Sequence, residues 1–279
     1  MNSTAKESRI ALIGFGAIAD EVIRSLDARG KLSTLVGFMV RPGRALQANQ
    51  KSLGRFTIVD NLPALFELQP NIIIEAAGHE AVLQFAAEVL RHGVDFLIAS
   101  VGALADPTLT ADLVAAAAPG TELWIASGAV AGIDGLLAAR SAGLRSVSYT
   151  SWKEPKAWNG TPAENMLGSG NNKERVIFFR GSAREAAKRF PKNANVAATI
   201  ALASLGLDRT LVQLGSDSLV SGPRGIIEAE GDFGRFEFDV LALASPINPK
   251  TSALTGHSLI AAVRDGMAFR ALDILRAAQ

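Results

Sequence analysis

A glycine-rich turn near the start of the chain is the pattern with the clearest chemical meaning. Residues 14–19 read GFGAIA and fit the spacing G-x-G-x-x-G/A. In this pattern the first glycine permits a tight turn, the second lets a pyrophosphate approach the backbone, and the small third residue lets helix and strand pack closely. Amides at the start of the following helix would bind the phosphate. We therefore expect Gly14, Gly16, Ala17 and Ile18 to contact a dinucleotide cofactor.

The residues after the next apolar run bear on which dinucleotide is bound. The run Leu35–Val40 is followed by Arg41, Pro42, Gly43 and Arg44, with no carboxylate to bind a ribose 2′-hydroxyl. Two arginines at this point can bind a 2′-phosphate instead. The pattern favours NADP over NAD. The alternative, in which both arginines are solvated loop residues and either cofactor is accepted, stays open.

Apolar runs that alternate with helical patterns must position this turn. Short strands are predicted at 9–13, 35–40, 57–59, 71–75, 95–99 and 122–126, and helices lie between most of them. Strands that alternate with helices of about a dozen residues are typical of a parallel sheet covered on both faces. Residues 1–127 are thus expected to form a doubly wound α/β (Rossmann) domain.

The pattern changes near Gly128. Strands are predicted at 146–152, 176–180, 211–214, 225–230 and 233–240, with helices at 133–142, 182–189 and 195–205. This arrangement indicates an α+β substrate domain, 128–250, with a mostly antiparallel sheet. A turn-rich connection at 154–172 has the length of a lid or binding loop. The last segment, 251–279, is expected to pack back on the first domain.

Composition excludes several classes of protein. The 279 residues include no Cys and three His, and 28 basic residues balance 27 acidic ones. Without Cys there are no disulfides and no thiolate metal ligands, and the scattered histidines leave no evident metal site. The balanced charge argues against nucleic acid or membrane as the main partner. The start of the chain has no signal-peptide pattern, so a cytoplasmic location is expected.

Several stretches resemble the L-aspartate dehydrogenase family. They are IEAAGH at 74–79, SVGAL at 100–104, SGAVAGID at 127–134, GSAREAA at 181–187, FPKNANVAAT at 190–199 and NPKTSAL at 248–254. With the glycine turn they extend over nearly the whole chain. The resemblance implies a homodimeric NAD(P)-dependent enzyme that interconverts L-aspartate with oxaloacetate and ammonia through iminosuccinate. Its substrate would be a small amino or imino dicarboxylate.

The resemblance also implies which residues contact the ligands. Ala129 and Asn195 match cofactor-binding positions of the family, although Asn195 could also cap a helix. Ala77, Gly78, Ser100, Val101 and Gly102 follow the fourth and fifth strands, at the sheet edge where ligands collect in such folds. Lys192, Asn193, Lys250 and Thr251 lie in the most specific blocks and are candidates for substrate binding.

One departure from the family leaves the reaction open. The family places a catalytic His before a β-hairpin, and the matching position here is Gly225. Glycine exchanges no proton, and a general acid–base is worth roughly 10²–10⁴ in rate. Another residue could act instead, the enzyme could be an imine reductase or use a different substrate, or the chain could bind NADP without turnover. The replacement candidates are His79, His257 and Lys153. Either Lys153 or Arg224 could bind a substrate carboxylate.

Overall fold

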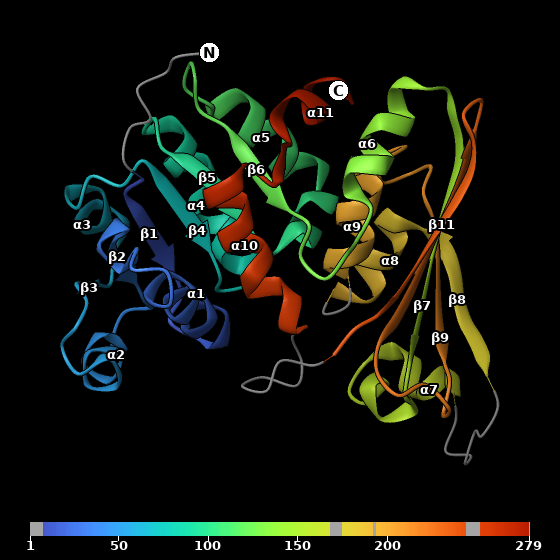
Figure 1. Cartoon of the computed structure of the whole chain (residues 1–279), viewed down its shortest axis with the longest axis horizontal. Coiled ribbons are helices and arrows are strands. Elements are labelled where there is room, and N and C mark those ends of the chain that lie inside the picture. The colour runs from blue at the N-terminus through green and yellow to red at the C-terminus, as the bar shows by residue number, and fades with distance from the viewer. Residues whose placement is uncertain (1–7, 168–174, 192–193, 244–251, 279) are drawn as a thin grey trace.

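The chain folds around two β-sheets. The computed structural model describes residues 8–167, 175–191, 194–243 and 252–278. Within these residues, sheet A has seven strands in the order β12-β6-β5-β4-β1-β2-β3, and sheet B has five in the order β11-β10-β7-β9-β8. Figure 1 shows sheet A with its helices in one half of the molecule and sheet B in the other. The predicted α/β class with a second, mostly antiparallel sheet is confirmed.

Sheet A is built from short, buried strands. Strands β1 to β6 run parallel, and β12 is antiparallel to its neighbour β6. The strand bounds are β1 Ile10–Ile13, β2 Leu35–Met39, β3 Ile58–Val59, β4 Ile72–Glu75, β5 Asp95–Ile98, β6 Leu123–Ala126 and β12 Ala268–Arg270. Because parallel strands carry their connections across the faces, both faces of this sheet are covered by helices.

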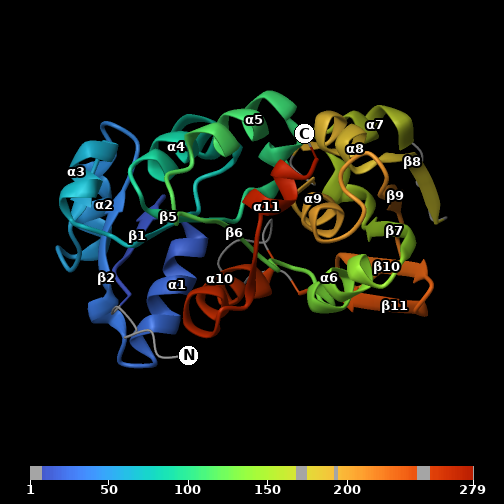
Figure 2. The same ribbon diagram turned by 90° about the horizontal axis from the view of Figure 1, so that it is seen from above.

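Alternation along β1 sends side chains to two separate cores. Ala11 and Ile13 pack in a core shared with α3, α4 and α5, whereas Ile10 and Leu12 pack with α1 and α10 on the other face. Figure 2 shows these two helix layers on opposite sides of the sheet. The bounds are α1 Ala17–Asp27, α2 Ala45–Ser52, α3 Leu62–Glu67, α4 His79–Arg91, α5 Pro107–Ala116, α10 Ala253–Asp265 and α11 Leu272–Arg276, with 3₁₀ turns η1 Leu32–Thr34 and η2 Val101–Ala105.

Sheet B is covered by helices on one face. Its strands are β7 Leu144–Lys153, β8 Val176–Ser182, β9 Leu211–Ser216, β10 Arg224–Gly231 and β11 Gly234–Leu241, and only the β7–β9 pair is parallel. Val147, Phe179, Val212 and Ile227 share a core with α6 Ile133–Ser141, α8 Ala183–Arg189 and α9 Ala194–Ala203. The start of α8 is fixed by a capping box between Ser182 and Glu185.

The connection at 154–172 is more ordered than the sequence predicts. It contains the 3₁₀ turn η3 Pro155–Trp158 and the helix α7 Pro162–Leu167. Trp158 is fully buried and meets Phe178 edge to face at 4.8 Å between ring centroids. Trp158 and Ala163 are the buried residues of its described part, so the segment is anchored to the core at these two points. The described part of this connection is therefore not a structureless loop.

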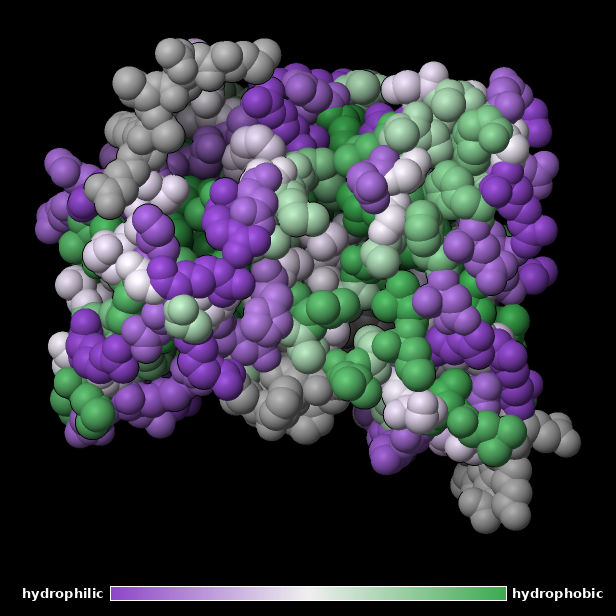
Figure 3. Space-filling view, in the orientation of Figure 1, coloured by the Kyte–Doolittle hydropathy of each residue, from purple (hydrophilic) through white to green (hydrophobic). Residues whose placement is uncertain are grey.

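The two sheets share one hydrophobic core. The cluster that contains Ile73 and Phe96 of sheet A continues into Tyr149 and Leu214 of sheet B. In the face drawn in Figure 3, hydrophobic residues gather over the seam between the sheets. The boundary near residue 127 therefore stays a prediction. Within the described residues, no helix has both the length and the apolar character needed to cross a bilayer.

Candidate active site

A cavity of about 490 Å³ lies between the carboxyl edge of sheet A and the inner face of sheet B. This volume is in the range of small-molecule sites. Nine of the predicted site residues line the cavity: Ile18, Ala77, Gly78, Ser100, Val101, Ala129, Lys153, Asn195 and Arg224. The cavity therefore joins the predicted cofactor edge to residues of the second half of the chain.

The glycine turn forms an open backbone cradle beside this cavity. Gly14 adopts φ +109°, and a Cβ there would lie 2.7 Å from the carbonyl oxygen of Ala76. Gly16 precedes α1, and no atom lies within 4 Å of the point where its Cβ would be. The first glycine is therefore needed by the fold, while the second leaves space at a helix N-terminus. Such a cradle fits a dinucleotide pyrophosphate.

A buried carboxylate holds the two loops that follow β4 and β5. Glu75 is fully buried. Its Oε1 accepts from the amides of Ala77 and Gly78 at 2.7 Å and from the Ser100 hydroxyl at 3.1 Å. Its Oε2 accepts from the amides of Ala99 at 3.3 Å and Ser100 at 2.9 Å. A buried carboxylate needs several donors, so Glu75 fixes both loops. The sequence predicts the strand that ends at Glu75 but not this role.

Asn195 connects α9 to the same edge of sheet A. Its Oδ1 accepts from the Gly102 amide at 3.0 Å and lies 2.8 Å from Nε2 of His79. Because an amide oxygen only accepts, Nε2 carries the proton. A Cβ on Gly102 would come within 2.9 Å of that nitrogen, so glycine lets the ring approach. The amide group of Asn195 is thereby held at the cavity wall.

The histidines lie away from the described cavity wall. His79 is hydrogen-bonded to Asn195 and is not among the residues that line the cavity. His257 is exposed on α10, although Thr255 and Ser258 on either side do line the cavity. His92 is exposed and stacks on Phe66 at 3.8 Å between ring centroids. The structure thus brings neither His79 nor His257 into the cavity as a catalytic group.

One face of β7 supplies polar groups to the cavity. Tyr149, Ser151 and Lys153 alternate along the strand and all line the cavity. Burial lowers the pKa of Lys153 to about 8, and its ammonium lies 5.1 Å from the centroid of the Trp158 ring. Burial raises the pKa of Tyr149, and a hydrogen bond with Ser151 opposes this shift. The β7 face therefore contains a neutral phenol and a partly desolvated amine.

Comparison with known proteins identifies the family. The model for the C-terminal domain of aspartate dehydrogenase matches residues 134–266, and that for the NAD binding domain of homoserine dehydrogenase matches residues 14–124. L-aspartate dehydrogenase of Ruegeria pomeroyi is 42% identical over 264 residues, 94% of each chain. That of Ralstonia nicotianae is 40% identical over 257 residues, 91% of this chain and 96% of the relative. The chain belongs to the aspartate dehydrogenase family.

The fold agrees with this assignment. The crystal structure of Thermotoga maritima aspartate dehydrogenase superposes with a TM-score of 0.71 at 23% identity, covering 93% of this chain and 97% of that one. The expectation of an NAD(P)-dependent amino acid dehydrogenase of this family is confirmed.

Gly225 stands where aspartate dehydrogenases are expected to carry the catalytic His, and a tyrosine fills the adjoining space. Gly225 of β10 pairs with Ser151 of β7. A Cβ built on Gly225 would lie 3.0 Å from Cε2 and 3.3 Å from Oη of Tyr149. Tyr149 is not among the site residues that the sequence predicts. Its alternation with Lys153 was the available signal, but the strand pairing that brings it to Gly225 is a tertiary feature.

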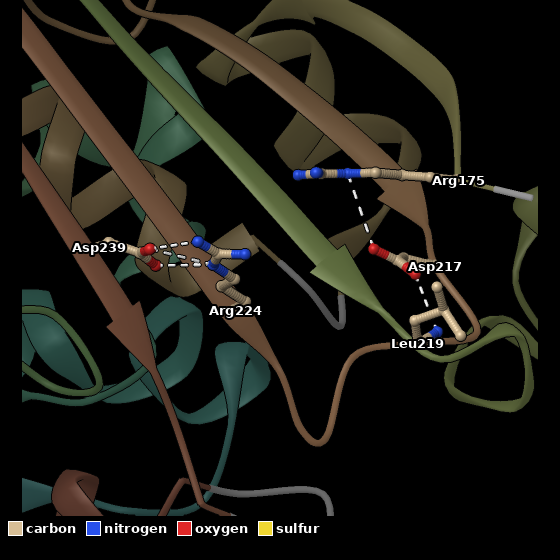
Figure 4. A network of polar contacts seen from close by, with 5 residues as sticks. All are labelled: Arg175, Asp217, Leu219, Arg224 and Asp239. Carbon is tan, nitrogen blue, oxygen red and sulfur yellow. Dashed lines mark hydrogen bonds and ion pairs between the residues drawn. The ribbon is translucent and has the colours of Figure 1, made fainter.

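Arg224 lines the cavity, but its charge is engaged elsewhere. Figure 4 shows its guanidinium bound to Asp239, with Nε to Oδ1 at 2.8 Å. Arg224 and Asp239 lie on the face of their strands that alternates with Gly225 and Val240. A nearby pair, Arg175 and Asp217, is separated by 3.6 Å. The guanidinium of Arg224 therefore lies on the side of sheet B opposite Tyr149.

The remaining predicted residues lie away from the cavity lining or outside the described residues. Arg41 and Arg44 are exposed after β2, and Arg44 donates to Oε1 of Gln47 at 2.7 Å. Lys192, Asn193, Lys250 and Thr251 are not among the described residues. Over the described ranges no cluster of three or more His, Asp or Glu side chains could hold a metal ion.

Proposed function

We propose that this enzyme interconverts L-aspartate and oxaloacetate plus ammonia through iminosuccinate, with a nicotinamide dinucleotide as the redox partner. The observation that carries the proposal is the cavity lined by the loops after β4 and β5 of sheet A and by Lys153 of sheet B, beside the backbone cradle of the glycine turn. When bound, the cofactor exchanges hydride with the substrate carbon. The protein's own task is to orient that carbon, bind its carboxylates and move protons.

Lys153 is assigned to a substrate carboxylate. Its amine is largely protonated at neutral pH because its pKa is about 8, and an ammonium in a partly dry cavity binds a carboxylate strongly. Lys192, Asn193, Lys250 and Thr251 remain predicted contacts for the second carboxylate and the loops around it. Asn195, held by Gly102 and His79, is assigned together with Ala129 to the nicotinamide ribose. His79 is then a positioning residue.

NADP is the proposed preferred cofactor. Arg41 and Arg44 follow β2, at the place where a 2′-phosphate would lie, and the start of α2 adds backbone amides at the same place. Arginine binds phosphate through several donors at once. Both side chains are exposed, so each can turn toward the phosphate without breaking a buried contact.

The glycine at position 225 favours a second candidate function, which is the reduction of an imine formed from a different 2-oxo acid. Loss of the family His would slow hydrolysis of the imine more than its reduction, because hydrolysis requires proton transfers to and from oxygen and nitrogen. An NADP-binding protein without turnover is the limiting case of this alternative.

We also propose a homodimer that uses the face of sheet B opposite α6, α8 and α9. That face carries paired charges such as Arg224–Asp239 and Arg235–Glu228, which can match their own copies across a two-fold axis. A mass measurement in solution tests this assembly. A cytoplasmic location stays a prediction.

One assay distinguishes the candidate reactions. Purified protein is mixed with NADPH and either oxaloacetate plus ammonia or a panel of other 2-oxo acids with ammonia or amines, and absorbance at the nicotinamide band is followed. Faster oxidation with oxaloacetate plus ammonia supports the proposal. Oxidation with another pair alone supports the imine reductase. Tight NADPH binding without oxidation in any mixture would overturn both reactions and would leave only an NADP-binding protein without turnover.

A further inference from the structure

We propose that Tyr149 performs the proton transfer in this active site, in the space left by Gly225. The inference rests on the proposed aspartate dehydrogenase reaction and adds a residue to it. No described histidine lines the cavity, so a residue of another type is the candidate for the proton-transfer group. Tyr149 is the only tyrosine in the chain.

The position of the phenol is the first argument. A side chain on Gly225 would begin 3.3 Å from the Tyr149 hydroxyl. The first atom of the expected His would therefore almost touch the oxygen that is present instead. Tyrosine replaces the missing imidazole from the neighbouring strand, through the pairing of Gly225 with Ser151.

The surroundings of the phenol are the second argument. Its register partners, Val212 on β9 and Ile227 on β10, are apolar and buried. On α9 the cavity is lined by Asn195, Val196 and Thr199, which carry no charge. The described lining contains no carboxylate, and its other titratable groups are Lys153 and Arg224, whose guanidinium is bound to Asp239.

These surroundings suit a proton donor that is neutral at physiological pH. Burial raises the pKa of Tyr149, so the hydroxyl is protonated at physiological pH and is available as a donor. The Ser151 hydroxyl, which shares a hydrogen bond with it, can stabilise the phenolate that forms when the proton leaves.

The proposed step balances in both directions. Ammonia adds to the ketone carbon of oxaloacetate, the C–N bond forms, and the resulting carbinolamine carries the former ketone oxygen as a hydroxyl. Tyr149 donates its proton to that hydroxyl as the C–O bond breaks, and water leaves. The nitrogen lone pair forms the C=N bond, and an N–H proton returns to the phenolate. In deamination the same transfers run in reverse, so no other reactant is needed.

The first test removes only the hydroxyl. Tyr149→Phe is compared with wild type and with Thr150→Val, which removes a hydroxyl from the opposite face of the same strand. We expect the Phe variant to lose about 10²–10⁴ in kcat, with little change in the Kd of NADPH, while Thr150→Val retains wild-type kcat. With NADPH deuterated at nicotinamide C4, we expect a normal isotope effect on wild-type kcat and an effect near one in the Phe variant. Carbinolamine breakdown would then limit the rate.

The second test changes the acidity of the phenol without removing it. Because the chain has one tyrosine, growth on a fluorinated tyrosine alters only residue 149. Fluorination lowers the phenol pKa, so the alkaline limb of the kcat profile should move to lower pH by the same shift. A residue with only a structural role would leave the limb unmoved.

The outcomes separate this inference from the proposed function. Wild-type protein that binds NADPH but does not convert oxaloacetate and ammonia overturns both. An active wild type whose kcat is unchanged by Tyr149→Phe, or whose alkaline limb ignores fluorination, overturns the role of Tyr149 alone. Lower kcat in the Phe variant with an undiminished isotope effect also overturns it, because carbinolamine breakdown would not have become limiting.

Discussion

The two sides of the cavity expose different groups, which are mostly backbone on one side and side chains on the other. The sheet A side presents mostly backbone: Gly16 leaves its cradle open, and Glu75 anchors the amides of the loops after β4 and β5. The sheet B side presents side chains, chiefly Tyr149 and Lys153 on β7. Backbone recognition suits the constant phosphates of a cofactor, whereas side chains adapt a site to a substrate. Changes in chemistry within one family should therefore concentrate on sheet B.

The two glycines of the turn test the sheet A side and carry the largest expected effect. Gly14→Ala should lower the free energy of unfolding by about 2–6 kcal/mol, since it adds backbone strain and a clash with Ala76, each worth roughly 1–3 kcal/mol. Gly16→Ala should leave the stability of the cofactor-free protein near wild type and weaken NADPH binding. Denaturant melts and NADPH fluorescence titrations measure both. Equal destabilisation by the two substitutions would contradict the assignment of Gly14 to the fold and of Gly16 to the phosphate cradle.

Lys153 tests the sheet B side. Lys153→Met should raise the KM for oxaloacetate by about 10–100-fold, because a charge-assisted hydrogen bond contributes about 1.5–3 kcal/mol, and should leave the Kd of NADPH unchanged. The ammonium is present below its pKa of about 8 and is lost above it. Wild-type kcat/KM should therefore fall as pH rises through about 8, and the Met variant should lack this fall. A loss of NADPH affinity in the variant would place Lys153 on the cofactor side instead.

Gly225 tests whether the tyrosine and the absent histidine compete for one space. Gly225→His alone should not restore a family-like enzyme, because its Cβ would press on the Tyr149 ring at 3.0 Å, an overpacking cost of roughly 1–3 kcal/mol. With Tyr149→Val in the same chain the imidazole gains room. Melting temperature and kcat across the four proteins of this double-mutant cycle give the coupling. Additive effects would mean that the two sites do not share the space.

The arginines after β2 carry the smallest expected effect. Replacement of Arg41 and Arg44 by Ala should weaken NADPH binding by about tenfold, or ~1.4 kcal/mol, and leave NADH binding unchanged. Both side chains are exposed, so water competes with them for the phosphate. Titrations of the variant with the two cofactors provide the comparison. An equal loss for both would show that the arginines do not read the 2′-phosphate.

How far the sequence predicts each side follows from the same division. The glycine turn and its strand and helix are contiguous in sequence, so the sheet A side could be predicted from local pattern. The absence of the family His, with glycine at position 225, can also be predicted from the sequence. The role of Glu75 could not be predicted from the sequence, because its partners are mostly backbone amides. The role of Tyr149 could not be predicted either, because the strand register that brings it to Gly225 depends on long-range pairing. The residue type of His79 predicts a catalytic group, whereas its hydrogen bond to Asn195 favours the proposed positioning role.

The pH dependence of wild-type kcat tests the central claim that side chains of sheet B carry the proton chemistry without histidine. It is measured by NADPH oxidation at saturating oxaloacetate and saturating free ammonia. Because burial raises the pKa of Tyr149 above that of an ordinary phenol, the account predicts a kcat that stays level from about pH 6 to 10. An inflection near pH 6.5, the ordinary pKa of an imidazole, would assign the proton transfer to a histidine and contradict the account.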